Sequence, residues 1–185
     1  MDGWRTVGRE LTRILTTLGL VMGATAGILR GLDSLPGYLL GEPRGVKRYR
    51  TLEEVERKLG ERLLLPSYFP DTLRWPPAAI RLVSGPPPSV TLAFVGREGD
   101  EERLILYQAF GRAGSVSPQL LPPGLVLQTT TVSVGGTEGE LTRIREEDGA
   151  IWHEVGWQRE GRQVALRFRG PVEELLKMAR SMRPR

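Results

Sequence analysis

The sequence of 185 residues predicts an α+β domain, in which an antiparallel meander of about six strands is packed by an N-terminal and a C-terminal helix. It also predicts a transmembrane helix ahead of that domain. Residues 11–29 are mostly apolar and carry a single charged residue. Residues 90–169, in contrast, hold short alternating segments separated by turn residues. The chain therefore divides into a short tail (1–10), a transmembrane or signal-anchor helix (11–33), a linker (34–48) and an α+β domain (49–183).

The apolar N-terminal segment carries a periodic set of glycines. Between Leu11 and Leu29 the only charged residue is Arg13. This length just suffices to cross a bilayer if the arginine reaches the headgroups. Small residues at every fourth position share one helix face and let two membrane helices approach closely. We expect this glycine zipper to pair with itself or with a partner helix through Gly19, Gly23, Gly27 and Gly31.

Three other interpretations of this segment stay open. It could be a signal peptide cleaved after Ala24-Thr25-Ala26, an amphipathic helix lying on a membrane surface, or a soluble helix packed on the domain. Basic residues flank the segment on both sides, with Arg5 and Arg9 before it and Arg30 and Arg44 after it. The positive-inside rule therefore does not settle the orientation.

Composition excludes several classes of site. The chain has no cysteine, which rules out a disulfide scaffold, a thiolate zinc site and a thiol nucleophile. Its 26 Lys and Arg residues exceed the 22 Asp and Glu residues by only four, and they form no polybasic block. The 23 glycines and 14 prolines indicate many turns.

Two helices are expected to pack the sheet. The first begins at Thr51, whose side chain and that of Glu54 form a capping box, and it ends at Gly60. The second runs from Pro171 to about Met182, with Pro at its first position and two glutamates in its first turn.

Between these helices the alternating segments predict strands joined by short turns. Asp148-Gly149 suits a two-residue type I′ turn, and Glu160-Gly161 is a weaker candidate. The expected strands cover residues 90–95, 103–109, 125–134, 139–147, 150–159 and 162–169.

Pairing outward from the two turns gives each strand an apolar and a polar face. His153 falls on the apolar face, opposite Ile144 and Phe168. The polar face forms the first candidate interaction surface, on which Trp152 and Glu154 lie among four arginines. These are Arg143, Arg145, Arg167 and Arg169. Such a face could bind nucleic acid or another anionic polymer, whereas its structural alternative is simple cross-strand stabilisation.

A second candidate surface consists of aromatic residues framed by prolines. Tyr68 and Phe69 lie between Pro66 and Pro70, and Trp75 precedes two more prolines. Because proline restricts its own backbone and that of its predecessor, this segment should form a stiff loop. It could offer a preorganised groove to a partner, or it could cap the edge of the core.

No residue pattern points to catalysis, to a cofactor or to a metal. His153 is the only histidine, and its apolar position indicates a packed side chain rather than a ligand. The acidic run Glu146-Glu147-Asp148 lies at a turn, where nothing makes its carboxylates converge. We therefore predict a protein that is not an enzyme.

Three segments of the chain resemble a domain family of unknown function that is common in Gram-positive-type bacteria. They are the helix start Thr51-Leu52-Glu53-Glu54-Val55, the element Leu64-Leu65-Pro66-Ser67-Tyr68-Phe69-Pro70, and the final helix from Pro171 to Ala179. The family often forms the extracytoplasmic part of anti-sigma-factor-like membrane proteins and lipoproteins. The resemblance covers about Tyr49 to Met182 and implies a domain outside the membrane. Only about a dozen residues precede the apolar helix, without His or Cys, so sigma-factor binding is not implied.

Three functions follow as expectations. The first is a single-pass, membrane-tethered, non-enzymatic envelope domain for sensing, docking or protein interaction, with an envelope protein or an anionic polymer as partner. The second is a carrier that holds a lipid or small ligand between the sheet and the terminal helices. The third is a soluble basic module that contacts nucleic acid.

Overall fold

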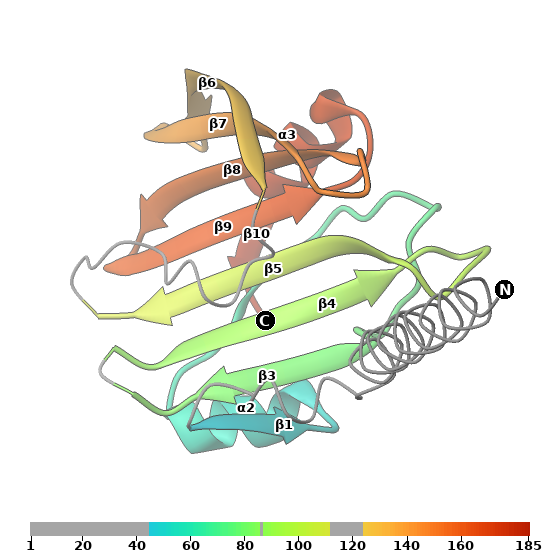
Figure 1. The fold of residues 1–185 in the computed structure, drawn as a ribbon. Coiled ribbons are helices and arrows are strands. Elements are labelled where there is room, and N and C mark those ends of the chain that lie inside the picture. The colour runs from blue at the N-terminus through green and yellow to red at the C-terminus, as the bar shows by residue number, and fades with distance from the viewer. Residues whose placement is uncertain (1–44, 86, 112–123) are drawn as a thin grey trace, which may run out of the picture. The chain divides into compact units, whose positions relative to one another are not determined.

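The computed structural model describes residues 45–85, 87–111 and 124–185, whose main feature is one antiparallel sheet of eight strands (Figure 1). The strands lie in the order β1-β3-β4-β5-β9-β8-β7-β6. Two consecutive meanders, β3 to β5 and β6 to β9, therefore meet where β9 pairs with β5. The bounds are β1 Val46–Tyr49, β3 Ala79–Val83, β4 Ser89–Val95, β5 Glu102–Phe110, β6 Leu125–Val134, β7 Thr137–Arg145, β8 Ile151–Arg159 and β9 Arg162–Phe168.

The fold class predicted from the sequence is wrong. The six predicted strands are present, but β1 and β3 extend the sheet to eight, and only two short helices accompany them. The sequence pattern did not predict these two strands, because β1 has two charges in four residues and β3 follows a run of prolines. No helix in the described residues is long and apolar enough to cross a membrane. The predicted span 11–33 and its glycine face lie outside the described residues.

The helices and a small two-stranded sheet pack on one face of the large sheet. Helix α2 (Leu52–Leu59) and helix α3 (Val172–Arg180) bury their apolar sides against the strands. Strand β2 (Leu64–Pro66) pairs with the C-terminal strand β10 (Met182–Pro184) and joins the same core. Apolar burial of this kind contributes about 25 cal/mol for each Å² removed from water. Side chains without exposed surface include those of Phe94, Leu92, Leu106, Leu166, Leu175 and Met178.

The predicted caps of the first helix are confirmed. The hydroxyl of Thr51 accepts a hydrogen bond from the Glu54 N–H, at 3.3 Å, and the Glu54 carboxylate accepts one from the Arg50 N–H. Gly60 ends the helix in the left-handed conformation, with φ of 75°. Helix α3 differs slightly from the prediction, because Pro171 is its N-cap residue and the helix begins at Val172.

A buried glutamine joins the small sheet to the large one. Gln108 in β5 has no exposed surface, and its amide reaches the backbone of Leu64 in β2. The Leu64 N–H donates to Oε1 at 2.9 Å, and Nε2 donates to the Leu64 carbonyl at 2.8 Å. The side chain thereby takes the place of a neighbouring strand for β2, whose other edge pairs with β10.

The two predicted turns differ in outcome. Glu160 and Gly161 both have positive φ, of 52° and 74°, as a type I′ turn requires. The other hairpin is a three-residue loop, because the Glu146 N–H bonds to the Ala150 carbonyl and Gly149 alone is left-handed. The predicted two-residue turn at Asp148-Gly149 is therefore wrong.

This extra turn residue shifts the predicted pairing of β7 with β8 by one position. Arg143 lies opposite His153, and Ile144 lies opposite Trp152. The pairing of β8 with β9 is as predicted, with His153 opposite Phe168. Because side chains alternate between faces, a slip of one residue moves every β7 side chain to the other side of the sheet.

We expect Gln108→Leu to lower the free energy of unfolding by about 2–5 kcal/mol, because two buried backbone groups of Leu64 would lose their partner. Chemical denaturation measures this change. The matched control is Gln163→Leu in β9, where the Oε1 atom has no hydrogen-bond partner in the described residues. That substitution should alter stability by no more than about 0.5 kcal/mol. Equal effects of the two variants would contradict the role of Gln108.

We expect Glu160→Asn to raise the free energy of unfolding by about 0.5–1 kcal/mol, since asparagine adopts positive φ more readily than glutamate. The ion pair that is lost, Arg159 with Glu160 at 3.5 Å, is partly exposed and contributes little. Thermal unfolding measures the gain. Glu147→Asn, in the hairpin where only the glycine is left-handed, serves as the control. It should raise the free energy of unfolding by less than Glu160→Asn does.

Candidate functional site

The four arginines of the first candidate surface do not share a face. Arg143 and Arg145 pair with His153 and Ile151, which places them on the side of the sheet that carries the helices. Arg167 lies opposite Glu154, on the other side. The prediction of a single basic face is therefore wrong, and its cause is the one-residue slip between β7 and β8.

The remaining members of that surface are buried or paired. Trp152 is only 4% exposed, so its ring is not accessible for stacking on a base. Arg167 is 5% exposed, and its Nε donates to the Glu154 carboxylate at 2.7 Å. Arg169 lies 3.4 Å from the carboxylate of Glu101. The structure thus gives Arg167 a cross-strand partner, as the structural alternative expects, whereas the partner of Arg169 lies just before β5.

The single histidine is held in a hydrogen bond with the backbone. His153 is half-buried, and its Nδ1 lies 3.0 Å from the carbonyl oxygen of Gly170, just ahead of α3. Within the described part of the chain, no three His, Cys, Asp or Glu side chains are grouped closely enough to hold a metal ion.

The second candidate surface separates into a structural part and an exposed part. Tyr68 is half-buried and belongs to the structural part. Its hydroxyl donates to the Glu174 carboxylate at 2.5 Å, and the Lys177 ammonium lies 3.7 Å from the centre of its ring. Both partners come from α3, so Tyr68 fixes the loop to that helix.

Phe69 and Trp75 form an aromatic cluster with Phe94 of β4. The ring centre of Phe69 lies 5.6 Å from that of Trp75 and 5.3 Å from that of Phe94, and Trp75 stacks on Phe94 at 6.0 Å. Phe94 has no exposed surface, whereas Trp75 is 52% exposed. The cluster therefore runs from the centre of the core to the surface, and Trp75 is its outer member.

Backbone hydrogen bonds hold this loop along β4. The Arg74 N–H donates to the Val95 carbonyl at 3.0 Å, and the Ala78 N–H donates to the Ala93 carbonyl at 2.8 Å. The peptide bond between Trp75 and Pro76 is cis. Trp75 is thus exposed from a segment whose backbone is fixed on both sides of it.

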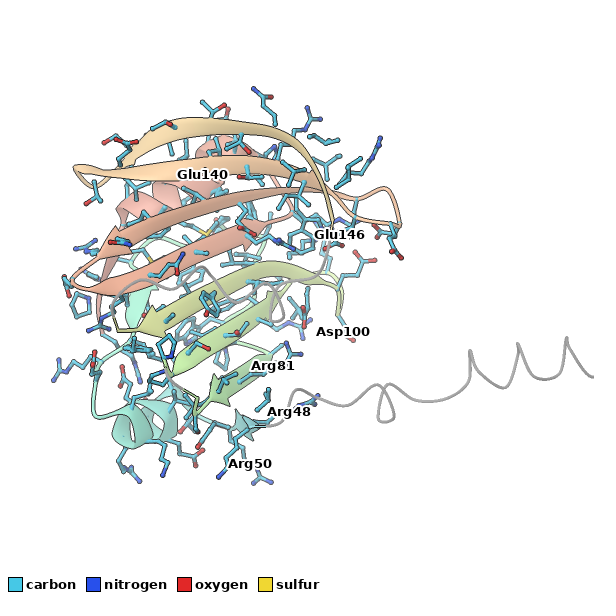
Figure 2. All side chains as sticks on the ribbon, turned by 60° about the vertical axis from the view of Figure 1, so that its left-hand side comes forward. Arg48, Arg50, Arg81, Asp100, Glu140 and Glu146 are labelled. Carbon is cyan, nitrogen blue, oxygen red and sulfur yellow. The ribbon has the colours of Figure 1, made fainter. Side chains whose placement is uncertain are left out.

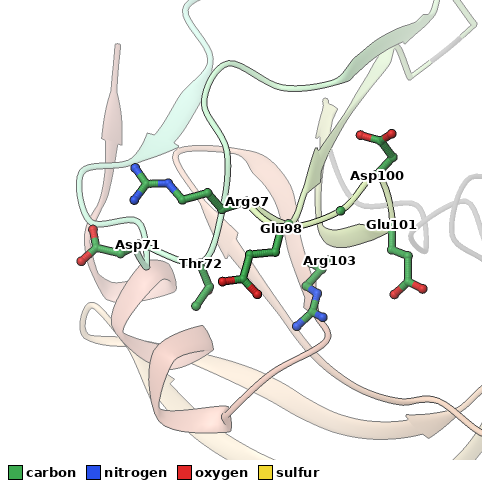
Figure 3. Close-up of a pocket in the computed structure, with 9 residues that line it drawn as sticks. Asp71, Thr72, Arg97, Glu98, Asp100, Glu101 and Arg103 are labelled. Atoms are coloured by element: carbon green, nitrogen blue, oxygen red, sulfur yellow. The ribbon is translucent and has the colours of Figure 1, made fainter.

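A charged hollow lies beside the same loop, where it meets the turn between β4 and β5 (Figure 3). The hollow has a volume of about 740 Å³ and carries charges of both signs. The Arg97 N–H donates to the Thr72 carbonyl at 2.8 Å, which joins its two walls. Arg74, next to Trp75, lies 3.6 Å from Asp100. Charged lining residues are Asp71, Arg97, Glu98, Asp100, Glu101 and Arg103.

Sequence reasoning missed this hollow. It predicts only a short turn between the strands at residues 90–95 and 103–109, and nothing in it places Asp71 beside that turn. The missing signal is the backbone pairing of residues 72–74 with β4, which depends on an isolated bridge between Leu73 and Gly96. No local sequence pattern predicts such a bridge.

Comparison with family models, curated proteins and solved structures finds no match to this chain. The resemblance based on the Leu-Pro-x-Tyr-x-Pro element therefore stays a prediction.

We expect Tyr68→Ala to lower the free energy of unfolding by about 2–4 kcal/mol, because it removes a half-buried ring and its hydrogen bond to Glu174. Trp75→Ala should cost only about 1 kcal/mol, since half of the ring is already in water. Denaturant unfolding of both variants measures the difference. A larger loss for Trp75→Ala would show that Trp75 is mainly a core residue.

Proposed function

We propose that this domain is a non-enzymatic docking module that binds a protein partner through the aromatic cluster and the adjoining hollow. The observation that carries the proposal is the half-exposed Trp75 stacked on the buried Phe94. Large aromatic rings are costly to leave in water, and tryptophan is enriched among the residues that dominate protein–protein binding.

The support beneath Trp75 suits it for binding. Phe69 packs against both Trp75 and Phe94, and the backbone hydrogen bonds of Arg74 and Ala78 restrict the loop. A side chain that is already ordered loses less conformational entropy when a partner covers it. Trp75 can therefore act as a preformed anchor.

The charged hollow supplies a polar rim next to this anchor. Protein interfaces place an apolar centre inside a ring of polar and charged groups. Asp71 and Glu98 line the hollow together with Arg97 and Arg103, so both signs of charge are available within a short distance. The partner expected here has a pocket for the indole ring and charged groups of both signs around it.

The alternatives receive less support. In the described core, Leu166, Leu175 and Met178 lie between the sheet and α3 without exposed surface. The hollow beside the start of that helix, at Leu141 and Val172, has a volume of only about 240 Å³, which is little room for a carried lipid. The nucleic-acid hypothesis required Trp152 and four arginines on one exposed face. Trp152 is buried, and the arginines lie on two faces of the sheet. Placement outside a membrane stays a prediction, because it depends on residues 11–33.

Site-specific photo-crosslinking in the source cells tests the proposal. The full chain carries benzoylphenylalanine at exposed position 72, which lines the hollow and leaves Trp75 intact, with the same group at exposed position 147 as the matched control. We expect a crosslinked adduct of defined mass from position 72 and none from position 147. Because binding depends on the indole ring, additional wild-type chain should reduce the adduct at least severalfold, whereas additional Trp75→Ala chain should not.

Two results would contradict this docking role. One is the absence of an adduct at position 72 when the labelled chain is folded and present at its normal level. The other is equal competition by the wild-type and Trp75→Ala chains, which would mean that the indole ring does not contribute to binding.

A further inference from the structure

Strand β6 forms an exposed edge of the large sheet and pairs only with β7 among the described strands (Figure 2). Its sequence, Leu-Val-Leu-Gln-Thr-Thr-Thr-Val-Ser-Val, contains neither a charged residue nor a proline. Nearly all of its side chains are exposed, including three large apolar ones at its start. These are Leu125 at 58%, Val126 at 57% and Leu127 at 41%.

The hairpin geometry shows which backbone groups of β6 point away from β7. Val134 and Thr137 close the hairpin around the two-residue turn Gly135-Gly136, so their backbone groups bond to each other. Hydrogen-bonded and non-hydrogen-bonded pairs then alternate along the strands. The outward N–H and C=O groups consequently belong to Ser133, Thr131 and Thr129.

The opposite edge of the sheet is protected from such pairing. Strand β1 is only four residues long and carries Lys47 and Arg48, the latter visible at that edge in Figure 2. Short length and charge are the usual means by which proteins prevent edge strands from pairing with other chains. Strand β6 has ten residues without charge, and its only irregularity is a bulge between Val126 and Gln128. The two edges therefore differ in their capacity to accept another strand.

We propose that β6 is a self-association edge, which pairs antiparallel with β6 of a second copy of this chain to continue the sheet. Two-fold symmetry places a strand against itself, and this demands a strand that does not repel itself. An uncharged strand meets that demand. When Thr131 of one copy lies opposite Thr131 of the other, Thr129 of each copy lies opposite Ser133 of its partner. The outward N–H and C=O groups of the two strands can then bond to each other along the centre of β6.

Side chains fit the same arrangement. Cross-strand pairs of threonine and serine are favourable in antiparallel sheets. The apolar start of one strand lies beside the turn of the other, where Gly135 and Gly136 have no side chain and are surrounded by open space. Leu125, Val126 and Leu127 would lose exposure to water there, which favours association. This surface is separate from the aromatic cluster and does not depend on its function.

Sedimentation of the full chain, in one detergent for all variants, tests the proposal. Every chain, wild type at β6 included, carries Gly23→Leu and Gly27→Leu, which remove the pairing expected of the glycine face. We expect a dimer for wild type and for Thr131→Val, which keeps the outward N–H. Thr131→Pro removes that donor but no bond to β7, and it should weaken dimerisation on the order of tenfold or more. Thr131→Lys, which does not restrict the backbone, should weaken it as well. Circular dichroism verifies that each variant is folded.

Disulfide crosslinking locates the contact, because the chain has no cysteine of its own. A cysteine introduced at position 129, 130 or 131 should yield a linked dimer from at least one position. A cysteine at Thr142, one strand further in on β7, should yield none, because the two β7 strands lie too far apart for a disulfide.

Three outcomes would overturn self-association through β6. They are a monomeric wild type at high concentration, a dimer that persists in folded Thr131→Pro and Thr131→Lys, and crosslinking from Thr142 as strong as from the β6 positions. A monomer whose β6 cysteines instead link to a different protein would assign the edge to a foreign strand and would likewise overturn the proposal.

Discussion

The constraint on which the arrangement of this domain depends is the need to satisfy the backbone of β2 inside the core. Strand β2 pairs with β10 on one edge, while its other edge faces the large sheet, away from water. Gln108 meets that need with one acceptor and one donor on Leu64. Because a buried backbone group without a partner costs about 1–3 kcal/mol, the amide fixes where the small sheet can lie.

Several other features follow from this position. Strand β10 comes directly after α3, so a fixed β2 also fixes the end of that helix. Helix α3 in turn holds Tyr68 through Glu174 and Lys177. The loop that follows β2 is thus anchored at its start by α3 and further along by β4. Trp75 belongs to this doubly anchored loop, and its half-exposed indole stacks on Phe94.

The proposed docking surfaces use different physical properties of the same sheet. The aromatic cluster offers one large side chain on a rigid base, at the end of the sheet where the β4–β5 turn lies. Strand β6 offers backbone hydrogen-bonding groups along an edge, with an uncharged surface that suits a copy of itself. Binding at the aromatic cluster depends on burial of the Trp75 ring, whereas binding at β6 depends on strand pairing. Single substitutions can therefore separate the two.

The sequence by itself determined the local elements. The caps of α2, the six strands between residues 89 and 168, and the turn at Glu160-Gly161 could all be predicted, because each depends on residues close together in the chain. The pairing of β8 with β9 followed from that turn. The aromatic loop was also recognised, although its division between a structural Tyr68 and an exposed Trp75 was not.

Only the tertiary structure decided which strands are neighbours and which side chains share a face. One extra residue in the turn before β8 moved Arg143 and Arg145 away from Arg167 and Arg169, since a slip of one position exchanges the faces of a strand. The pairing of β9 with β5, the burial of Trp152 and the role of Gln108 join residues far apart in the chain. Local sequence patterns do not predict such contacts, because the contacts form only when the complete sheet and its core are assembled.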